Sequence, residues 1–195
     1  MNKIKKILAA NRSEIAIRIF RAAEESGIKT AAIYSKEDRF ALHRFKTDES
    51  YLVGEGKGPI QAYLDINSII DIAKKAGVDA IHPGYGFLSE NPDLADQCEK
   101  NNIIFIGPTK EILNRLGNKT SAKEVADEAG VSTIPSVKVN EENKKTIRDD
   151  INKIGYPVIV KASWGGGGRG MRVVRSPDEL SEQIELAQSE SKKAF

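Results

Sequence analysis

The first 115 residues alternate between strand-like and helical segments, and this alternation restricts the folds open to the chain more than any other feature. Residues 4–10 are typical of a strand, residues 13–26 of a helix and residues 30–35 of a second strand. A strand, a helix and a strand within about 35 residues form a βαβ unit, which requires parallel strands. The pattern predicts an open, mostly parallel α/β sheet over residues 1–115.

The alternation continues to the end of this region. Ser13 is expected to cap the first helix, and Gly27 and Gly77 are expected to follow helix ends. Pro92 suits a helix start, and Thr109 is expected to cap the last helix. The further elements expected are a strand at 51–53, a helix at 66–76, a strand at 79–83, a helix from 92 to about 101, a buried strand at 103–108 and a helix to 116.

The pattern changes after Gly117, so we expect a helical linker over residues 116–133 and a second, smaller part over residues 134–195. The sequence predicts a charged helix to Gly130, a strand at 136–139, a polar helix at 141–154, strands at 156–162 and 171–174, and a helix from Ser176 to about 192.

Composition excludes several classes of protein. The chain has 195 residues, 39% of them hydrophobic, and a formal net charge of +2, which argues against a basic nucleic-acid-binding face. No apolar run is long enough to span a membrane, and the N-terminus does not resemble a targeting segment. The single cysteine, Cys98, excludes an internal disulfide, and two histidines with one cysteine exclude a Cys/His zinc cage. We expect an intracellular, cytoplasmic α/β protein.

A glycine run follows the strand at 156–162. Gly165, Gly167 and Gly170 match G-x-G-x-x-G literally, but a strand follows, whereas the dinucleotide fingerprint requires a helix. Met171 occupies the place of the Walker A lysine, so that motif fails too. What remains is a glycine-rich hairpin whose backbone N–H groups could cradle phosphate, with Lys161 and Arg169 beside it, or else a flexible surface hairpin.

Two other segments lie where strands end. Residues 81–92 follow a predicted strand, and ligands of open α/β sheets collect beyond such carboxyl ends. Within them, a hydrogen-bonded structural role is favoured for His82, and Phe87 and Leu88 are expected to be buried. Residues 9–16 lack the glycine that a dinucleotide loop needs, so a helix cap formed by Asn11 and Ser13 is the better interpretation.

Together these segments resemble the biotin carboxylase family within the ATP-grasp enzymes. The matching stretches are residues 10–16, 82–91, 105–108 and 155–171. The resemblance implies a Rossmann-like, pre-ATP-grasp domain over 1–115, followed after the 116–133 linker by part of an ATP-grasp lid lobe over 134–195. Residues 42–50 and 56–65, with Trp164, look most like pyruvate carboxylases.

The resemblance implies an ATP-dependent ligase. ATP and bicarbonate form carboxyphosphate with Mg²⁺ as a cofactor, and carbon dioxide passes to the ureido nitrogen of biotin. In pyruvate carboxylases the group then moves to pyruvate, giving oxaloacetate. The alternatives are a piece of an acyl-CoA carboxylase and a non-catalytic fragment or interaction module. A carbamoyl-phosphate synthase is disfavoured by the Tyr85-Gly86 segment and Trp164.

The same resemblance assigns roles to individual residues. Tyr85 and Gly86 lie near the biotin pocket. The remaining assignments concern ATP: Lys119 and Lys161 contact its phosphates, Gly165, Gly166, Gly167 and Gly168 form the lid over them, Arg169 could join them, and Met171 lies near the nucleotide. The family's catalytic and metal-binding residues belong to a later lobe, so we expect none of either kind in this chain.

These assignments set the expected partners. They are ATP, a biotinyl domain, the remaining carboxylase segments and a second copy in a homodimer, with neither nucleic acid nor membrane. Because the catalytic lobe is expected elsewhere, the 195 residues alone are expected to be inactive.

Overall fold

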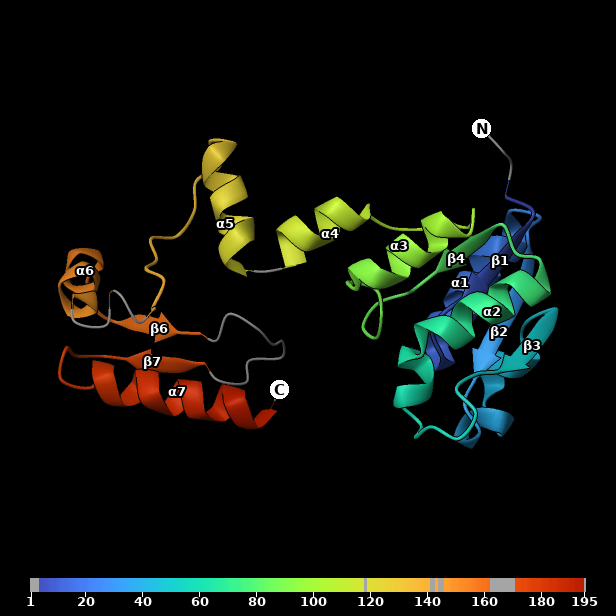
Figure 1. Cartoon of the computed structure of the whole chain (residues 1–195), viewed down its shortest axis with the longest axis horizontal. Coiled ribbons are helices and arrows are strands. Elements are labelled where there is room, and N and C mark those ends of the chain that lie inside the picture. Colours follow the sequence, from blue (N-terminus) through green and yellow to red (C-terminus); the bar gives the residue numbers. More distant parts are fainter. Residues whose placement is uncertain (1–3, 118, 141–142, 144–145, 162–170, 195) are drawn as a thin grey trace. The chain divides into compact units, whose positions relative to one another are not determined.

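The computed structural model describes residues 4–117, 119–140, 143, 146–161 and 171–194 of the chain (Figure 1). The chain divides into two compact units, Met1–Asn114 and Arg115–Phe195. Each unit contains its own hydrophobic cluster, so each is described by itself.

The first unit is built on a five-stranded parallel sheet of order β3-β2-β1-β4-β5, which confirms the predicted open α/β sheet. Its strands are β1 (Lys6–Ala9), β2 (Lys29–Tyr34), β3 (Glu49–Leu52), β4 (Ala80–His82) and β5 (Ile104–Phe105). The helices are α1 (Ser13–Glu25), α2 (Ile66–Ala76), α3 (Pro92–Lys100) and α4 (Lys110–Gly117), with 3-10 turns η1 (Glu37–Phe40), η2 (Leu42–Phe45) and η3 (Gln61–Leu64).

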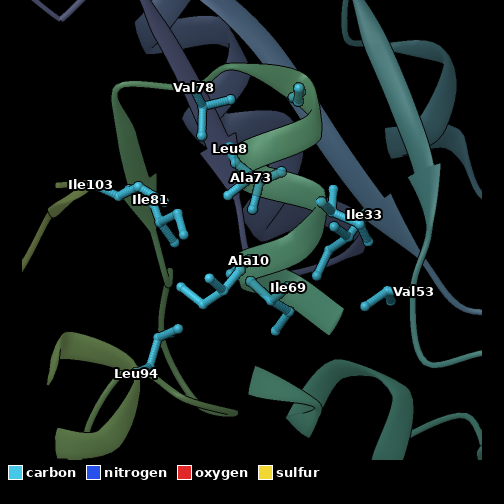
Figure 2. Close-up of a cluster of buried hydrophobic side chains, with 14 of the residues drawn as sticks. Leu8, Ala10, Ile33, Val53, Ile69, Ala73, Val78, Ile81, Leu94 and Ile103 are labelled. Carbon is cyan, nitrogen blue, oxygen red and sulfur yellow. The ribbon is translucent and has the colours of Figure 1, made fainter. Parts of the chain in front are cut away.

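Helices cover both faces of this sheet because successive strand residues point to opposite sides. Leu8 of β1 clusters with Ile69 and Ala73 of α2, as Figure 2 shows. Its neighbour Ala9 clusters instead with Phe20 of α1. The sheet is therefore a buried central layer, and only its two ends and the connecting loops remain open for a site.

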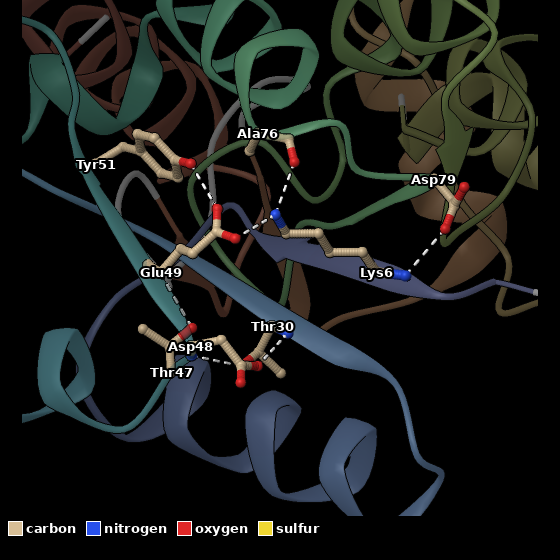
Figure 3. Close-up of polar contacts among 8 residues, drawn as sticks. All are labelled: Lys6, Thr30, Thr47, Asp48, Glu49, Tyr51, Ala76 and Asp79. Atoms are coloured by element: carbon tan, nitrogen blue, oxygen red, sulfur yellow. Dashed lines mark hydrogen bonds and ion pairs between the residues drawn. The ribbon is translucent and has the colours of Figure 1, made fainter.

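Charged groups tie the amino ends of the strands together (Figure 3). Lys6 Nζ donates to Glu49 Oε1 and to the Ala76 carbonyl, both at 2.7 Å. The Tyr51 hydroxyl donates to the other Glu49 oxygen at 2.6 Å, and Asp79 accepts from the Lys6 backbone N–H at 2.9 Å. The hydrogen bond from Lys6 holds the pKa of Glu49 below its usual range. The contacts at this end of the sheet therefore hold neighbouring elements of the first unit together.

Helix ends with strong sequence signals were predicted well. Helix α2 has the predicted bounds, Gly77 follows it at φ 61°, and Asp65 caps its start. Helix α3 begins at Pro92 as predicted, with the Asn91 carboxamide accepting from the first-turn N–H groups at 2.8 and 3.2 Å. The hydroxyl of Thr109 accepts from Ile112 N–H at the start of α4, also as predicted.

Two predictions in the first unit are wrong. Ser13 does not cap α1: Arg12 is the N-cap residue, without a side-chain cap, and Ser13 is helical residue one with φ 53°. The predicted buried strand at 103–108 shortens to β5, and its Ile104 is exposed because β5 lies at the edge of the sheet. Periodicity does not reveal which strand lies at an edge.

The second unit contains a two-stranded antiparallel sheet of β6 (Val158–Val160) and β7 (Arg172–Val174). Its helices are α5 (Lys119–Glu128), α6 (Ile147–Ile154) and α7 (Leu180–Ala194). The buried cluster joins α6, β7 and α7 through Ile147, Ile151, Val174, Leu180 and Ile184. The predicted pair of strands is therefore confirmed as a hairpin-like pair.

Three predictions in the second unit need correction. Residues 136–139 form no strand, although Val137 and Val139 pack, partly buried, on the core. The helix expected at 141–154 is helical from Ile147, and residues 141, 142, 144 and 145 lie outside the described residues. The last helix begins at Leu180, since Ser176–Glu179 form a turn first.

Candidate functional site

The topology of the first unit places one site at the carboxyl ends of β1 and β4. From β1 the chain moves to β2 on one side, and β4 pairs with β1 on the other side. Loops that leave two such neighbouring strands in opposite directions open a crevice between them, where ligands of α/β sheets bind. The loops in question are residues 10–12 after β1 and residues 83–91 after β4.

A pocket of about 330 Å³ lies at this crevice. It is lined by Asn11, Arg12, Ser13, Glu14 and Ile15 from the first loop and helix start, and by Tyr85, Gly86 and Phe87 from the second. The Tyr85 side chain is 65% exposed, and its hydroxyl lies 3.5 Å from Glu14 Oε2. The pocket thus offers a cation, an acid, a phenol and aromatic surface to one small ligand.

Asn11 joins the two loops. Its side-chain Nδ2 donates to the Pro83 carbonyl at 2.8 Å and to the Tyr85 carbonyl at 3.0 Å, and its Oδ1 accepts from Arg12 N–H at 2.9 Å. Asn11 is completely buried, and every one of these bonds is to backbone. The predicted capping role is wrong, because Asn11 accepts from the N-cap residue itself and α1 has no side-chain cap; Asn11 instead sets the path of the loop after β4.

Gly84 allows this close approach. A Cβ at this position would lie 2.7 Å from Asn11 Nδ2 and 2.6 Å from the Ile15 methyl group, and its φ of 68° disfavours any other residue. The loop continues through Gly86 at φ 68° and Phe87 at φ 41°. Three residues with positive φ within four positions give Tyr85 and Gly86 a defined backbone path at the pocket.

Arg12 also lines the pocket and is held by a charged and two aromatic side chains. Its guanidinium donates to Asp38 Oδ2 at 3.3 Å and lies 5.5 Å from the ring centroids of both Tyr63 and Phe87. Those two rings stack on each other at 5.2 Å and 15°. Tyr63 is fully buried and donates to Asp38 at 2.7 Å; burial and this bond raise the pKa of its hydroxyl.

The two histidines are structural, as predicted for His82. The His82 Nδ1 accepts from Gly84 N–H at 3.0 Å, and desolvation lowers the pKa of this side chain. The His43 Nε2 lies 3.1 Å from the Ile33 carbonyl, which can only accept, so Nε2 carries the proton. Burial lowers the pKa of His43, and its Nδ1 has no hydrogen-bond partner among the described residues.

The second unit presents a different surface. Ile159 and Val173 are directly paired across β6 and β7, and they are 52% and 46% exposed. Because side chains alternate along a strand, Ile159 and Val173 lie on the face opposite the side that packs on α7. Lys161 follows β6 directly and Met171 precedes β7 directly, and both are exposed. An exposed lysine and an exposed methionine thus stand at one end of this apolar face.

The structure thus describes only part of the predicted ATP set. Lys161 and Met171 are exposed and adjoin the same end of the β6–β7 pair. Lys119 is the first residue of α5, and its side chain lies outside the described part. Residues 165–169, which include the predicted lid glycines and Arg169, also lie outside it.

Cys98 and Leu88 follow their predictions, and Phe87 follows its prediction only in part. Cys98 is fully buried and desolvation raises the pKa of its thiol to about 12, so it is a core residue. Leu88 is buried as predicted, whereas Phe87 is only partly buried because it also lines the pocket.

Two other kinds of feature are absent from the described part of the chain. Within the described ranges, no three His, Cys, Asp or Glu side chains come close enough together to bind a metal ion. No helix in this same part of the chain has the length and apolar character needed to cross a membrane.

Sequence reasoning missed the residues behind the pocket, Asp38 and Tyr63, and gave Arg12 no role. Asp38 and Tyr63 lie 26 and 51 positions beyond Arg12 in the sequence and meet it only in the fold. One available signal was the position of all three residues near the carboxyl ends of strands or in the segments that follow them, where sites form.

With this geometry in place, the class of protein follows from comparison with family models. The model described as biotin carboxylase, N-terminal domain, matches residues 3–113, more than half of the chain. The chain belongs to the biotin carboxylase family. A second model, described as carbamoyl-phosphate synthase L chain, ATP binding domain, matches residues 118–195.

Individual relatives narrow the resemblance to pyruvate carboxylases. The pyruvate carboxylase of Bacillus subtilis is 57% identical over 98% of this chain, which covers 17% of that protein. The structure of Rhizobium etli pyruvate carboxylase with acetyl coenzyme A superposes with a TM-score of 0.88 at 52% identity, over 100% of this chain and 17% of that one.

A second similar structure holds ligands. The biotin carboxylase domain dimer of the Hydrogenobacter thermophilus 2-oxoglutarate carboxylase, in complex with MgADP, ADP and bicarbonate, superposes with a TM-score of 0.92. It is 44% identical over 100% of this chain and 43% of its own. The chain therefore spans 17% of the length of the first two of these proteins and 43% of the third.

Proposed function

We propose that this chain is the N-terminal part of a pyruvate carboxylase that carboxylates biotin with ATP and bicarbonate and passes the carboxyl group to pyruvate. The observation that carries the proposal is the 57% identity to a pyruvate carboxylase over 98% of the chain. Residues 1–115 would form the N-terminal α/β domain, 116–133 the helical linker and 134–195 part of the ATP-grasp lid.

The exposed face of the β6–β7 pair would bind ATP. Ile159 and Val173 provide apolar surface suited to a flat nucleobase, and Met171, next to them, can adapt to it. Lys161 places an ammonium group at the end of that face, where it would neutralise phosphate oxygens. Lys119, Arg169 and the glycines Gly165, Gly166, Gly167 and Gly168 would complete the phosphate contacts, as the family resemblance implies.

The pocket between Asn11–Ile15 and Tyr85–Phe87 would receive biotin. Its volume of about 330 Å³ suits the compact bicyclic head group of biotin, and aromatic and aliphatic side chains line it beside polar ones. Tyr85 and Gly86 would border the ureido ring. What these residues do is bind and orient; Mg²⁺ and the groups that transfer the carboxyl lie, by the resemblance, in the remaining carboxylase segments.

The same resemblance suggests the surroundings of the chain. We propose a biotinyl domain as a partner, a homodimer like the one named for the Hydrogenobacter domain, and a cytoplasmic location without nucleic-acid or membrane contacts. The 195 residues on their own would not carboxylate biotin, because the later lobe supplies the catalytic groups.

A chimera tests the function. Residues 1–195 replace the matching segment of the Bacillus subtilis enzyme, and bicarbonate-dependent ADP release is measured with and without free biotin. We expect biotin-stimulated ATP cleavage that falls at least tenfold in Lys161→Ala, while Lys153→Ala, a lysine exposed on α6, changes it little. A correctly folded chimera without biotin-stimulated cleavage would contradict the proposal.

The isolated chain tests the predicted incompleteness. We expect purified residues 1–195 to cleave ATP with biotin and bicarbonate no faster than their own Lys161→Ala variant. A rate clearly above that variant would show that the missing groups are not required.

A further inference from the structure

We propose that Arg12 is a positioning residue: held by Asp38 and Tyr63, it fixes the backbone of the Tyr85–Phe87 loop in the shape that accepts a ligand. The assignment of that ligand as biotin rests on the proposed function, whereas the effect on the loop does not. Arg12 itself lines the pocket, but the ligand contacts would come from Tyr85 and Gly86.

The anchor behind Arg12 is rigid. Asp38 lies in η1. Its carboxylate accepts from the Tyr63 hydroxyl at 2.7 Å and from the Arg12 guanidinium at 3.3 Å. The same hydroxyl accepts from the buried Ser35 N–H at 3.2 Å, at the end of β2. Because Tyr63 is fully buried and bonded on both sides, the carboxylate that it holds gives Arg12 a fixed partner.

Arg12 contacts the loop through the Phe87 ring. Its planar guanidinium faces the stacked pair of Tyr63 and Phe87, a geometry that favours arginine over lysine. Phe87 holds a φ of 41°, a conformation that a bulky residue adopts only when its surroundings impose it. The stack with Tyr63, the cation above it and packing on the main hydrophobic cluster hold Phe87 in this conformation.

The loop is thus held on both sides of the Tyr85 side chain, and the Gly86 carbonyl in addition accepts from Ser89 N–H at 2.9 Å. Asn11 binds the Pro83 and Tyr85 carbonyls at one end, and Arg12 with Tyr63 holds Phe87 at the other. Between these points the Tyr85 side chain stays largely exposed. Two neighbouring residues of one turn therefore determine where Tyr85 and Gly86 present their backbone groups to the pocket.

The first test measures the loop itself in the 195-residue protein. Backbone amide chemical shifts of Gly84, Gly86 and Leu88 are compared between wild type and Arg12→Met, with Arg21→Met as the matched control. Arg21 is an exposed arginine on α1 outside the pocket lining. We expect large shifts in the loop for Arg12→Met, smaller ones for Arg12→Lys, and none there for Arg21→Met.

A second variant covers the case in which Arg12→Met fails to fold. Asp38→Asn keeps the size of the side chain but removes the charge that holds the guanidinium, so we expect the same loop amides to shift in the same direction. Loop shifts in folded Arg12→Met or Asp38→Asn no larger than in Arg21→Met would overturn the proposal.

The second test measures the consequence for biotin in the chimera. We expect Arg12→Met to raise the KM for free biotin about fivefold with kcat changed less than twofold, and Arg12→Lys to recover part of the loss. An equal loss in kcat with an unchanged KM would contradict a positioning role. A wild-type chimera without biotin-dependent turnover would refute the proposed function but leave the amide comparison to decide this inference.

Discussion

The two units of this chain treat their sheets differently. In the first, helices cover both faces of the parallel sheet, and β1 residues such as Leu8 and Ala9 are fully buried on opposite sides. In the second, Val174 is buried on one side of a two-stranded sheet while Ile159 and Val173 remain about half exposed on the other. The first sheet is a scaffold that carries its site at its end, and the second presents its own face as a surface.

This difference implies that the two regions would achieve ligand specificity in different ways. The pocket of the first unit depends on loop geometry, which the scaffold holds through buried groups such as Asn11 and Tyr63. The exposed face of the second unit depends on the side chains of the strands themselves. We therefore expect substitutions in the first region mainly to lower the free energy of unfolding, and substitutions on the exposed face of the second region mainly to weaken ligand binding.

The largest expected effect tests that contrast directly. Ile81→Ala, in the fully buried part of β4, should lower the free energy of unfolding by about 2–5 kcal/mol, through lost burial and a cavity. Ile159→Ala on the exposed face should change it by less than about 0.5 kcal/mol. Urea unfolding followed by amide signals of each unit measures both. Equal losses would show that the outer face of β6–β7 is covered in solution.

The next effect concerns the loop after β4. Gly84→Ala must accommodate a Cβ 2.7 Å from Asn11 Nδ2 at a positive φ, and we expect a loss of about 2–4 kcal/mol. Gly77→Ala is the matched control, because it has a similar φ but nothing within 4 Å, and should cost only about 1–2 kcal/mol. Thermal unfolding compares the two. Equal costs would mean that Asn11 moves aside freely.

Acid should affect the first unit more than the second. Both histidines lie in the first unit, and desolvation holds the pKa of each below the ordinary value of 6.5. The unfolded chain therefore takes up protons first, and stability falls as pH drops below about 6.5, by up to about 1.4 kcal/mol per pH unit for each histidine.

His43→Gln isolates one of these contributions. Glutamine can still donate to the Ile33 carbonyl but cannot titrate, so the decline of the unfolding free energy between pH 7 and 5 should become shallower. Urea titrations across that range measure the slope. An unchanged slope would indicate that His43 takes up its proton in the folded state.

The smallest expected effect is a gain. Ser13 begins α1 with φ 53°, which glycine adopts without steric cost, so Ser13→Gly should stabilise the first unit by about 0.5–1 kcal/mol. Asn102→Gly, at φ 55°, should gain less because asparagine tolerates this conformation. Melting temperatures of the two variants give the comparison, and a loss in Ser13→Gly would show that the hydroxyl contributes a contact.

The sequence predicted elements best where a local signal marks their ends. Helix α2 between Asp65 and Gly77 and helix α3 at Pro92 have such signals. The wrong predictions depended on partners distant in sequence. Residues 136–139 have a strand-like sequence but no neighbouring strand to pair with, and nothing local marked β5 as an edge.

The candidate site divides in the same way. The family resemblance assigned Tyr85 and Gly86 to the biotin pocket, and the structure places both residues in the lining of a pocket. The residues that hold this loop come from three separate segments, and Asn11 was interpreted only as a cap because its contacts with Pro83 and Tyr85 span more than 70 positions. Long-range hydrogen bonds to backbone leave no pattern in a single sequence.

The buried thiol of Cys98 has a practical consequence. It is the single cysteine of the chain, it is shielded from water within α3, and its pKa of about 12 leaves almost no thiolate at neutral pH. A disulfide reagent should therefore modify it only when the first unit opens. The rate of that labelling therefore reports how often the first unit opens, without any engineered probe.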